Sequence, residues 1–392
     1  MIKIAILNKI SQKGLSCFSS NFIQVDDVNE ANGILVRSQD LRSMEFSTHL
    51  LAIARAGAGV NNIPLDRCSE SGIVVFNTPG ANANAVKELV LTGLLMAARN
   101  LTSAIAWTKT LTDDIPKAVE KNKSKFAGHE IKGKTIGVIG LGSVGVMVAN
   151  GAECLGMRVL GYDPYISVVS AHDLSSNVHL VETLDALLPL CDYVTIHVPF
   201  MENTKEMINR ERLAMMKKNV CLLNFSRDQL VHENDVLEAI ENDIIRSYIT
   251  DFPSHRLLEN EKVICIPHLG ASTHESEENC SMMAVEEIID FLENGNIRNS
   301  VNFPAINLGV CTSSARLVVL NKNVPAMLGS ITGCLAEMNI NISNLINRSK
   351  GDYAVTLVDI DSYVDEAEIK SVLESVDGII SVRVLPNDRD SH

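Results

Sequence analysis

The chain has no hydrophobic run long enough to cross a membrane, and its first residues form too short and mixed a stretch for a signal peptide. It also has no excess of positive charge. Its 34 Lys and Arg against 48 Asp and Glu give a net charge of −14, which disfavours binding to nucleic acid or an anionic membrane. The nine cysteines include no C-x-x-C pair. We therefore expect a cytoplasmic protein with buried, reduced thiols and no metal site.

The 392 residues suffice for two or three domains, and 46% apolar with 21% charged residues is typical of a globular protein. Short apolar runs alternate with helical patterns over residues 1–95 and again over 131–275, which predicts two doubly wound α/β units. The expected strands are Ile2–Leu7, Gly33–Val36, Ala52–Arg55, Ile73–Phe76, 135–139, 157–162, 192–197, 219–224, 246–250 and 262–266. The expected helices are Val86–Ala98, Leu101–Asn122 and 276–293.

A smaller unit follows the linker Asn294–Ser313. Its pattern predicts, in order, a strand, a helix, two strands, a helix and a strand: Ala315–Leu320, Pro325–Met338, Asn341–Ser349, Tyr353–Ile360, Glu366–Ser375 and Ile379–Val384. This order is that of the ferredoxin-like fold. The predicted fold class is therefore α/β, with two doubly wound Rossmann-like domains and a C-terminal ferredoxin-like (βαββαβ) domain.

One segment carries the pattern of a dinucleotide site. The apolar strand that ends at Ile139 leads into Gly140-x-Gly142-x-x-Gly145, a helical stretch follows, and a second strand ends on Asp163, 23 residues after Gly140. Glycines permit the tight turn and close approach of a pyrophosphate, and the helix N-terminus offers N–H groups to the phosphates. Asp163 would accept hydrogen bonds from the ribose diol of NAD and would repel the 2′-phosphate of NADP. The pattern therefore favours NAD over NADP.

Polar residues follow several other strands of the same unit, where a parallel sheet binds its ligands. His268 comes after an apolar strand and precedes a loop, so it can exchange a proton near neutral pH, although a histidine there can also cap a loop. Arg227 has the same position after another strand. Its guanidinium can clamp a carboxylate, or it can form a surface ion pair with Asp228 or Glu233.

These motifs, with others along the chain, resemble those of the D-2-hydroxyacid dehydrogenase family. The matching segments are Leu35-Val-Arg-Ser38, Arg55-Ala-Gly-Ala-Gly-Val-Asn61, Asn77-Thr-Pro79, Gly140-Leu-Gly-Ser-Val-Gly145, His197-Val-Pro199, Asn224-Phe-Ser-Arg227 and Pro267-His-Leu-Gly-Ala-Ser-Thr273. The C-terminal unit resembles an ACT domain, an amino-acid-sensing module. The resemblance implies a substrate-binding domain at 1–96 with 277–302, an NAD-binding domain at 97–276 and an ACT domain at 313–392.

The resemblance also implies roles for individual residues in the oxidation of a small phosphorylated 2-hydroxy acid. His268 would accept the proton of the C2 hydroxyl, and Arg227 would hold the carboxylate and the C2 oxygen. The implied NAD-binding residues are Gly140, Gly142, Ser143, Val144, Gly145, Asp163, His197, Pro199, Asn224, Asp251 and Gly270. The implied substrate-binding residues are Arg37, Ser38, Arg55, Gly57 and Asn77, with phosphate contacts from Arg37, Ser38 and Arg55. The helices near 86–122 would form the interface of a homodimer or homotetramer.

The sequence departs from the family's pattern in three places. The family's catalytic glutamate has no counterpart in Thr250-Asp-Phe-Pro-Ser-His-Arg256: His255 occupies its place or the loop is shortened, and Glu259 or Glu261 are alternative substitutes. Ser143 replaces a basic residue. In the ACT-like unit, Asn321 and Ala326 replace a histidine and a glycine, while Asn323 and Asn344 remain candidates for binding L-serine. A purely structural dimerisation role is the alternative for this unit.

Two other functions remain open at this stage. One is a relative that acts on glycerate, lactate or hydroxypyruvate, against which Arg37, Ser38 and the C-terminal unit argue. The other is a dinucleotide-binding sensor without turnover, which the missing glutamate favours and the presence of both Arg227 and His268 opposes.

Overall fold

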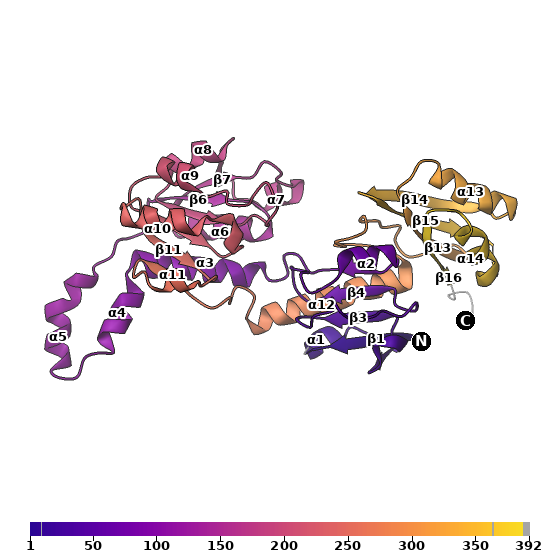
Figure 1. Cartoon of the computed structure of the whole chain (residues 1–392), viewed down its shortest axis with the longest axis horizontal. Helices are drawn as coiled ribbons and strands as arrows, with labels where there is room; N and C mark the ends of the chain where they lie inside the picture. Colours follow the sequence, from indigo (N-terminus) through magenta and orange to yellow (C-terminus); the bar gives the residue numbers. More distant parts are fainter. Residues whose placement is uncertain (9, 363, 387–392) are drawn as a thin grey trace. The chain divides into compact units, whose positions relative to one another are not determined.

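The structure is a computed structural model that describes residues 1–8, 10–362 and 364–386. It divides into two compact units, one formed by Met1–Ala81 with Glu277–His392 and the other by Asn82–Ser276 (Figure 1). Each unit contains its own parallel sheet, and the first also contains a separate antiparallel sheet. The predicted α/β class with parallel sheets is therefore confirmed.

The sheet of the 82–276 unit has seven parallel strands in the order β12-β11-β10-β9-β6-β7-β8. The strands are β6 (Thr135–Ile139), β7 (Arg158–Tyr162), β8 (His179–Leu180), β9 (Tyr193–Ile196), β10 (Val220–Asn224), β11 (Ile245–Thr250) and β12 (Val263–Cys265). The chain starts in the centre at β6, builds outward to β8, and then crosses to the other side of β6 with β9. This reversal beside β6 is the position at which doubly wound sheets bind ligands. The sequence predicted six of the seven strands and missed β8, whose two residues are both exposed.

The helices of this unit are α3 (Ala83–Ala98), α4 (Leu101–Thr108), α5 (Ile115–Asn122), α6 (Ser143–Cys154), α7 (Val168–Asp173), α8 (Leu184–Leu187), α9 (Arg210–Met215), α10 (Glu233–Glu241) and α11 (His255–Leu258). The prediction of one helix over Leu101–Asn122 was wrong, because residues 109–114 separate α4 from α5. Asp114 has a φ of +39°, and Pro116 lies in the first turn of α5. Proline is compatible with a helix start but not with a helix interior.

The N-terminal sheet of the other unit is also entirely parallel, in the order β2-β1-β3-β4-β5. Its strands are β1 (Ile2–Leu7), β2 (Phe22–Val25), β3 (Gly33–Val36), β4 (Ala52–Arg55) and β5 (Val74–Phe76). The helices are α1 (Gln12–Leu15), α2 (Leu65–Glu70) and the long α12 (His274–Asn294). The sequence did not predict β2, an edge strand of four residues with only Phe22 buried.

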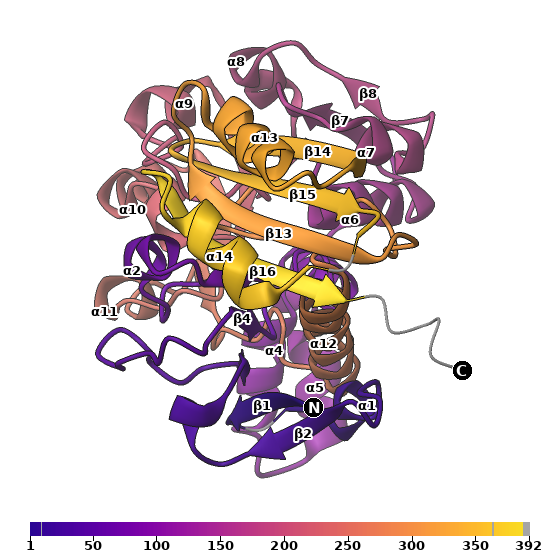
Figure 2. The same cartoon turned by 90° about the vertical axis from the view of Figure 1, so that its right-hand side faces the viewer.

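The C-terminal module of the same unit comprises β13 (Ala315–Lys322), α13 (Met327–Glu337), β14 (Ile342–Lys350), β15 (Tyr353–Ile360), α14 (Glu366–Glu374) and β16 (Ile379–Pro386). The element order is as predicted, and the strands form an antiparallel sheet ordered β14-β15-β13-β16. Figure 2 shows α13 and α14 on one face of this sheet. Alternate residues of β13 serve the two faces: Leu317 and Val319 pack with the helices, while Val318 and Leu320 join the core that contains Phe291 of α12.

One fully buried arginine connects this module to α12 and to the linker. Arg316 Nε lies 2.6 Å from Asp359 Oδ1, and its Nη1 donates to the carbonyl oxygens of Asn294 at 2.9 Å and Gly309 at 2.6 Å. A buried guanidinium needs both a counter-charge and acceptors for its remaining N–H groups. The end of α12 and the linker supply those acceptors, so the loss of either would leave N–H groups of Arg316 without a partner.

Among the described residues, no single helix has the length and apolar content needed to span a membrane, although α3 and α4 together, across a 69° bend, meet both requirements. The nine cysteines form no disulfide. Cys68, Cys191, Cys221 and Cys280 are buried as expected, whereas Cys17 and Cys154 are exposed.

Glu287, buried on α12, makes the stability of the protein depend on pH. Its Oε1 accepts a hydrogen bond from Asn299 Nδ2 at 2.6 Å, while its Oε2 is buried without a partner among the described residues. Burial raises the pKa of Glu287 to about 7, although Asn299 and Arg298 oppose the shift. Since the folded pKa exceeds the unfolded value of about 4.5, the native state loses stability as pH rises from about 4.5 to about 7.

We therefore expect Glu287→Gln to increase the free energy of unfolding at pH 8 by about 1–3 kcal/mol, given about 1.4 kcal/mol per pKa unit, and to have little effect at pH 5. Urea denaturation at the two pH values measures this difference. Glu293→Gln, an exposed glutamate near the end of the same helix, is the matched control and should change stability at neither pH. An equal gain at pH 5 and pH 8 would contradict the assignment of the shift to Glu287.

Candidate functional site

The glycine turn between β6 and α6 has the geometry of a phosphate cradle. Gly140 has a φ of +89°, and a Cβ at this position would lie 2.8 Å from the backbone of His197. A Cβ on Gly145 would overlap the carbonyl oxygen of Gly140. Around Gly142, in contrast, no atom of the described residues lies within 4 Å of the Cβ position, and no side chain caps the helix that follows. The first N–H groups of α6 therefore face open space beside Gly142, where an anion can approach them.

Asp163, at the end of β7, supports this turn. Its Oδ2 accepts a hydrogen bond from the N–H of Leu141 at 2.8 Å, and its Oδ1 accepts one from the N–H of Tyr165 at 2.8 Å. Each carboxylate oxygen has a second lone pair for a further donor such as a ribose hydroxyl. The acid predicted to bind the ribose thus also holds the glycine turn in place.

A hydrogen bond joins the loops after β9 and β10. Asn224 is fully buried, and its amide donates to the carbonyl of Arg227 at 2.8 Å. Ser226 Oγ donates to the carbonyl of Val198 at 2.6 Å, which joins the two loops. These bonds fix the backbone from which the half-buried side chain of Arg227 projects.

His197, at the end of β9, is held as a neutral imidazole. Its Nε2 is hydrogen-bonded to Thr195 Oγ1 at 2.9 Å, and burial lowers the pKa of His197 to about 3. A neutral ring offers a hydrogen bond to a ligand but no positive charge. Thr195, which the sequence did not single out, therefore fixes the orientation of this imidazole ring.

Asp251 is the most unusual group at this edge of the sheet. It directly follows β11, its side chain is 1% exposed, and its only nearby backbone donors, the N–H groups of Asp251 itself and Gly270, are poorly aligned with the carboxylate oxygens. Its Oδ2 lies 3.6 Å from the Cβ position of Gly270. Burial raises the pKa of Asp251, while the positive charges of His268 and Arg227 act in the opposite direction. The three residues that the sequence placed after separate strands therefore interact electrostatically.

His268 itself lies exposed in the loop after β12. Its ring meets the ring of Phe252 edge-on, with 4.9 Å between the centroids. Sequence reasoning did not identify Phe252, although its place next to Asp251 was a usable signal. Phe252 restricts the orientation of the imidazole without providing a polar partner.

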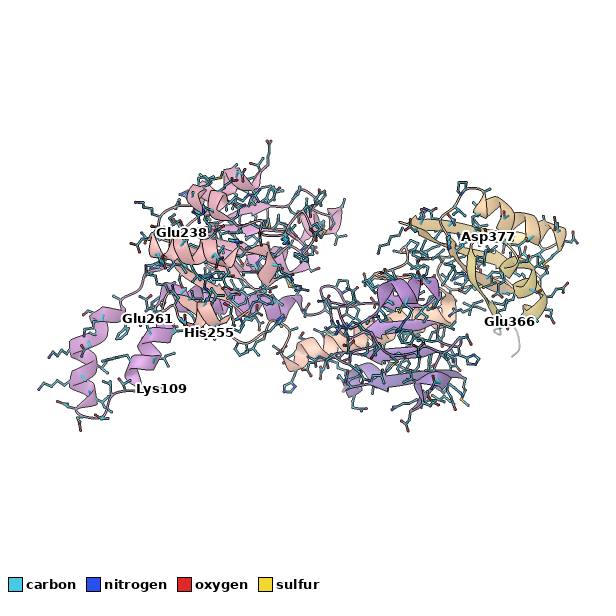
Figure 3. All side chains as sticks on the ribbon, in the orientation of Figure 1. Lys109, Glu238, His255, Glu261, Glu366 and Asp377 are labelled. Carbon is cyan, nitrogen blue, oxygen red and sulfur yellow. The ribbon has the colours of Figure 1, made fainter. Side chains whose placement is uncertain are left out.

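The residues considered as substitutes for the missing glutamate lie elsewhere on the surface. His255 begins α11, is 90% exposed, and its Nδ1 lies 3.4 Å from Glu259 Oε1. Figure 3 labels His255 and Glu261 on the 82–276 unit. Glu261 is also exposed, and none of the three has an interaction with His268 among those of the described residues. Asp251, which adjoins the Phe252 that contacts His268, is a buried carboxyl group that interacts electrostatically with this histidine.

The predicted substrate residues follow strands of the N-terminal sheet in the other unit. The Oδ1 atom of Asn8, which has a φ of +72° after β1, accepts hydrogen bonds from the N–H groups of Ser38 at 3.1 Å and Gln39 at 2.7 Å. Arg37 forms an ion pair with Glu277 at 2.8 Å. The sequence analysis missed both Asn8 and Glu277; Asn8 was detectable as the residue that follows the first strand.

Two neighbouring loops of this sheet are also tied together. Asn77 Nδ2 donates to the carbonyl of Ala58 at 2.6 Å, and the N–H of Thr78 donates to the carbonyl of Gly57 at 3.2 Å. A Cβ on Gly57 would overlap the guanidinium of Arg55, so the arginine lies directly over this glycine. The loop after β4 thus keeps a backbone conformation set by the loop after β5.

The two candidate regulatory residues lie in the C-terminal module. Asn323 follows β13, and its amide donates to the carbonyl of Gly351 at 3.0 Å. Asn344 is an exposed residue of β14. No interaction between them is present among the described residues.

Comparison with known proteins places these features in context. Residues 91–270 match the profile of the D-isomer specific 2-hydroxyacid dehydrogenase NAD-binding domain. The chain is 31% identical over 353 residues to a D-3-phosphoglycerate dehydrogenase of Haemophilus influenzae, covering 87% of this chain and 83% of the relative. It is 34% identical over 314 residues to the enzyme of that name from Methanocaldococcus jannaschii, where the match covers 77% of this chain and only 58% of the relative.

A solved structure is similar as well. The NAD+-bound 3-phosphoglycerate dehydrogenase of Entamoeba histolytica superposes with a TM-score of 0.60 at 26% identity, over 77% of this chain and 98% of that chain.

The glycine turn yields a prediction that separates packing from ligand access. The methyl group of Gly145→Ala would displace the Gly140 carbonyl, so we expect this substitution to lower the melting temperature. It should also lower the affinity for NADH at least about tenfold, which corresponds to about 1.4 kcal/mol of binding free energy. Gly142→Ala should leave the melting temperature unchanged and lower only the affinity, because its methyl group meets ligand rather than protein. Fluorescence titration with NADH and thermal melts measure the two quantities.

The matched control is Gly329→Ala in α13, where a Cβ meets no described atom within 4 Å. It should leave NADH affinity unchanged. If Gly142→Ala destabilises the protein but keeps full affinity, the open space beside Gly142 is not the phosphate position.

Proposed function

The chain belongs to the D-isomer-specific 2-hydroxyacid dehydrogenase family, and within it we propose the NAD-dependent oxidation of D-3-phosphoglycerate to 3-phosphohydroxypyruvate, the first step of L-serine biosynthesis. The observation that carries the proposal is the placement of Arg227, Asp251 and His268 directly after three neighbouring strands of the sheet whose strand β6 leads into the glycine turn. Arg227 can bind a carboxylate, His268 can accept a proton, and the glycine turn can bind the cofactor. The names of the relatives support the choice of substrate.

The residues present fit NAD. The free N–H groups at the start of α6 suit the pyrophosphate, and Asp163 suits the ribose diol. Asp251 has two buried oxygens with unused acceptor capacity, and these suit the NH2 group of a nicotinamide carboxamide. When bound, the nicotinamide accepts the hydride that leaves C2 of the substrate.

His268 and Arg227 divide the remaining chemistry. As the C2–H electron pair departs, the imidazole of His268 takes the proton of the C2 hydroxyl, and the C2–O bond becomes a carbonyl. The planar guanidinium of Arg227 binds the substrate carboxylate and polarises the C2 oxygen. Phe252 keeps the imidazole in one orientation. Asp251 provides the negative charge near His268 that the family's glutamate, absent from this sequence, would otherwise provide.

The substrate phosphate would be bound by Arg37, Ser38 and Arg55, and its carboxylate by the backbone near Gly57. Local positive charge is needed because the chain carries a net charge of −14. The Arg37–Glu277 pair is about one-third exposed on each side, so exchanging the carboxylate for a phosphate costs little.

The domain roles follow the same proposal: substrate binding by 1–96 with 277–302, NAD binding by 97–276, and an ACT domain at 313–392. We assign assembly into a homodimer or homotetramer to α4 and α5. Figure 1 shows these two helices as an arm that extends from the 82–276 unit, and Leu101, Ile105 and Ile115 on it are exposed.

The decisive measurement is NADH oxidation in the presence of 3-phosphohydroxypyruvate. We expect turnover, and we expect His268→Ala to lower kcat by about 10²–10⁴-fold, the usual contribution of a general acid or base. His255→Ala, an exposed histidine of the same unit, is the matched control and should keep wild-type kcat. Faster turnover of hydroxypyruvate or pyruvate would indicate another substrate in the family. NADH binding without turnover of any of these would indicate a sensor.

Feedback by L-serine is tested separately. We expect millimolar L-serine to lower activity or raise the melting temperature, and Asn344→Ala to weaken the effect while leaving activity without serine unchanged, because Asn344 lies exposed on β14. D-serine serves as the control ligand. If L-serine changes neither quantity, the C-terminal module has a structural role only.

A further inference from the structure

A pocket of about 360 Å³ lies within the Met1–Ala81/Glu277–His392 unit, between the linker and β14 of the C-terminal module. This is the size of pocket that binds small metabolites. Ile297, Ile306 and Ile346 provide an apolar lining, and Arg298 and Arg348 provide positive charge. Neither the proposed reaction nor the two regulatory asparagines use this pocket.

The charges around the pocket do not cancel. Arg298 pairs with Asp290, with Nη2 and Oδ2 3.0 Å apart, and Asp290 also accepts hydrogen bonds from Asn294 and Asn296. Arg348 is exposed and forms no ion pair with any described residue. The pocket therefore has one uncompensated guanidinium above an apolar lining, in a protein that is strongly acidic overall.

We propose that this pocket binds a small organic acid, with its carboxylate on Arg348 and Arg298 and its short apolar body on the isoleucines. A guanidinium binds a carboxylate through two parallel hydrogen bonds. A single carboxylate matches the one uncompensated charge, and a second would lie close to Asp290. The isoleucines exclude a fully polar anion such as phosphate as the preferred ligand.

Asn299 connects this pocket to the loops after β4 and β5. It lines the pocket, its Nδ2 donates to Glu287, and its carbonyl accepts the N–H of Asn77 at 3.4 Å. Asn77 in turn donates to the carbonyl of Ala58. Two hydrogen bonds thus lead from the pocket wall to the loop assigned to the substrate carboxylate.

The C-terminal module is also hydrogen-bonded to the same segment of the linker. Lys350, at the end of β14, donates to the carbonyls of Ser300 and Val301, both at 3.0 Å. The N–H of Val301 donates to the carbonyl of Val75 in β5, the edge strand of the N-terminal sheet. A ligand between β14 and this segment would therefore shift the loops after β4 and β5, and change the KM for the hydroxy acid rather than kcat.

The binding part of the proposal is independent of the reaction, whereas the KM effect rests on the proposed function. We use 3-methylbutanoate as the probe, 3-methylbutanamide as its neutral analogue and inorganic phosphate as a polar anion. Calorimetry and thermal melts should show saturable binding of 3-methylbutanoate and weaker binding of the other two. Arg348→Ala should abolish binding, and Ile346→Asn should weaken it.

Arg158→Ala removes an exposed arginine at the start of β7 and is the matched control; it should bind the probe like the wild type. Binding that survives Arg348→Ala lies at another site, such as the substrate site, and overturns the proposal. The absence of saturable binding, or tighter binding of phosphate, also overturns it. These outcomes require no turnover and so are distinct from failure of the proposed activity.

The KM effect is tested with substrate under the same conditions. Saturating probe should change KM at least about fivefold, the lower end of typical allosteric coupling. Lys350→Ala should keep probe binding but reduce the KM change. Probe binding with an unchanged KM in the wild type would overturn the coupling through Asn299.

Discussion

Every strand of both α/β sheets runs in the same direction within its sheet, and this constraint determines where chemistry can occur. In a parallel sheet all carboxyl ends meet at one edge, so residues distant in sequence are brought together by strand order alone. Arg227, Asp251 and His268 follow three consecutive strands, β10, β11 and β12, which are neighbours in the sheet. Their electrostatic interaction is a direct consequence of that order.

Polar side chains hold the loops at this edge in place. Asn224 holds the backbone at Arg227, Ser226 connects the loops after β9 and β10, and Asp163 connects the glycine turn to β7. Asp251 is the exception, since its carboxylate is buried and has only poorly aligned backbone donors. A buried acid with unmet hydrogen bonds costs free energy, and a bound carboxamide would lower that cost. We propose the same residue as the acidic partner of His268 in place of the usual glutamate.

The C-terminal module is bound to its unit by polar contacts at fixed points as well as by apolar packing. Arg316 holds the end of α12 and the linker, Lys350 holds the segment at Ser300, and Arg383 lies over the ring of Phe291, 4.5 Å from its centroid, and donates to the Phe291 carbonyl. Each contact joins a strand of the module to the chain that leads back to the N-terminal sheet. A ligand on the module therefore acts on a segment that is already hydrogen-bonded to β5.

The sequence by itself determined most of the fold and the position of the cofactor turn. Apolar periodicity placed nearly all strands, because each must be buried in its sheet, and glycine spacing located a turn that only glycine can form at Gly140. Short exposed strands such as β8 and the break between α4 and α5 were missed, because neither has a strong apolar period.

Only the tertiary structure decided which carboxyl group interacts with His268. The sequence offered His255, Glu259 and Glu261 as substitutes, yet these residues lie exposed in and just after α11, and Asp251 lies buried at the strand end. The contacts of Asn8, Phe252 and Asn299 also depend on strand order and loop packing. Distances between residues far apart in sequence are set by the assembled sheet, and no local pattern contains them.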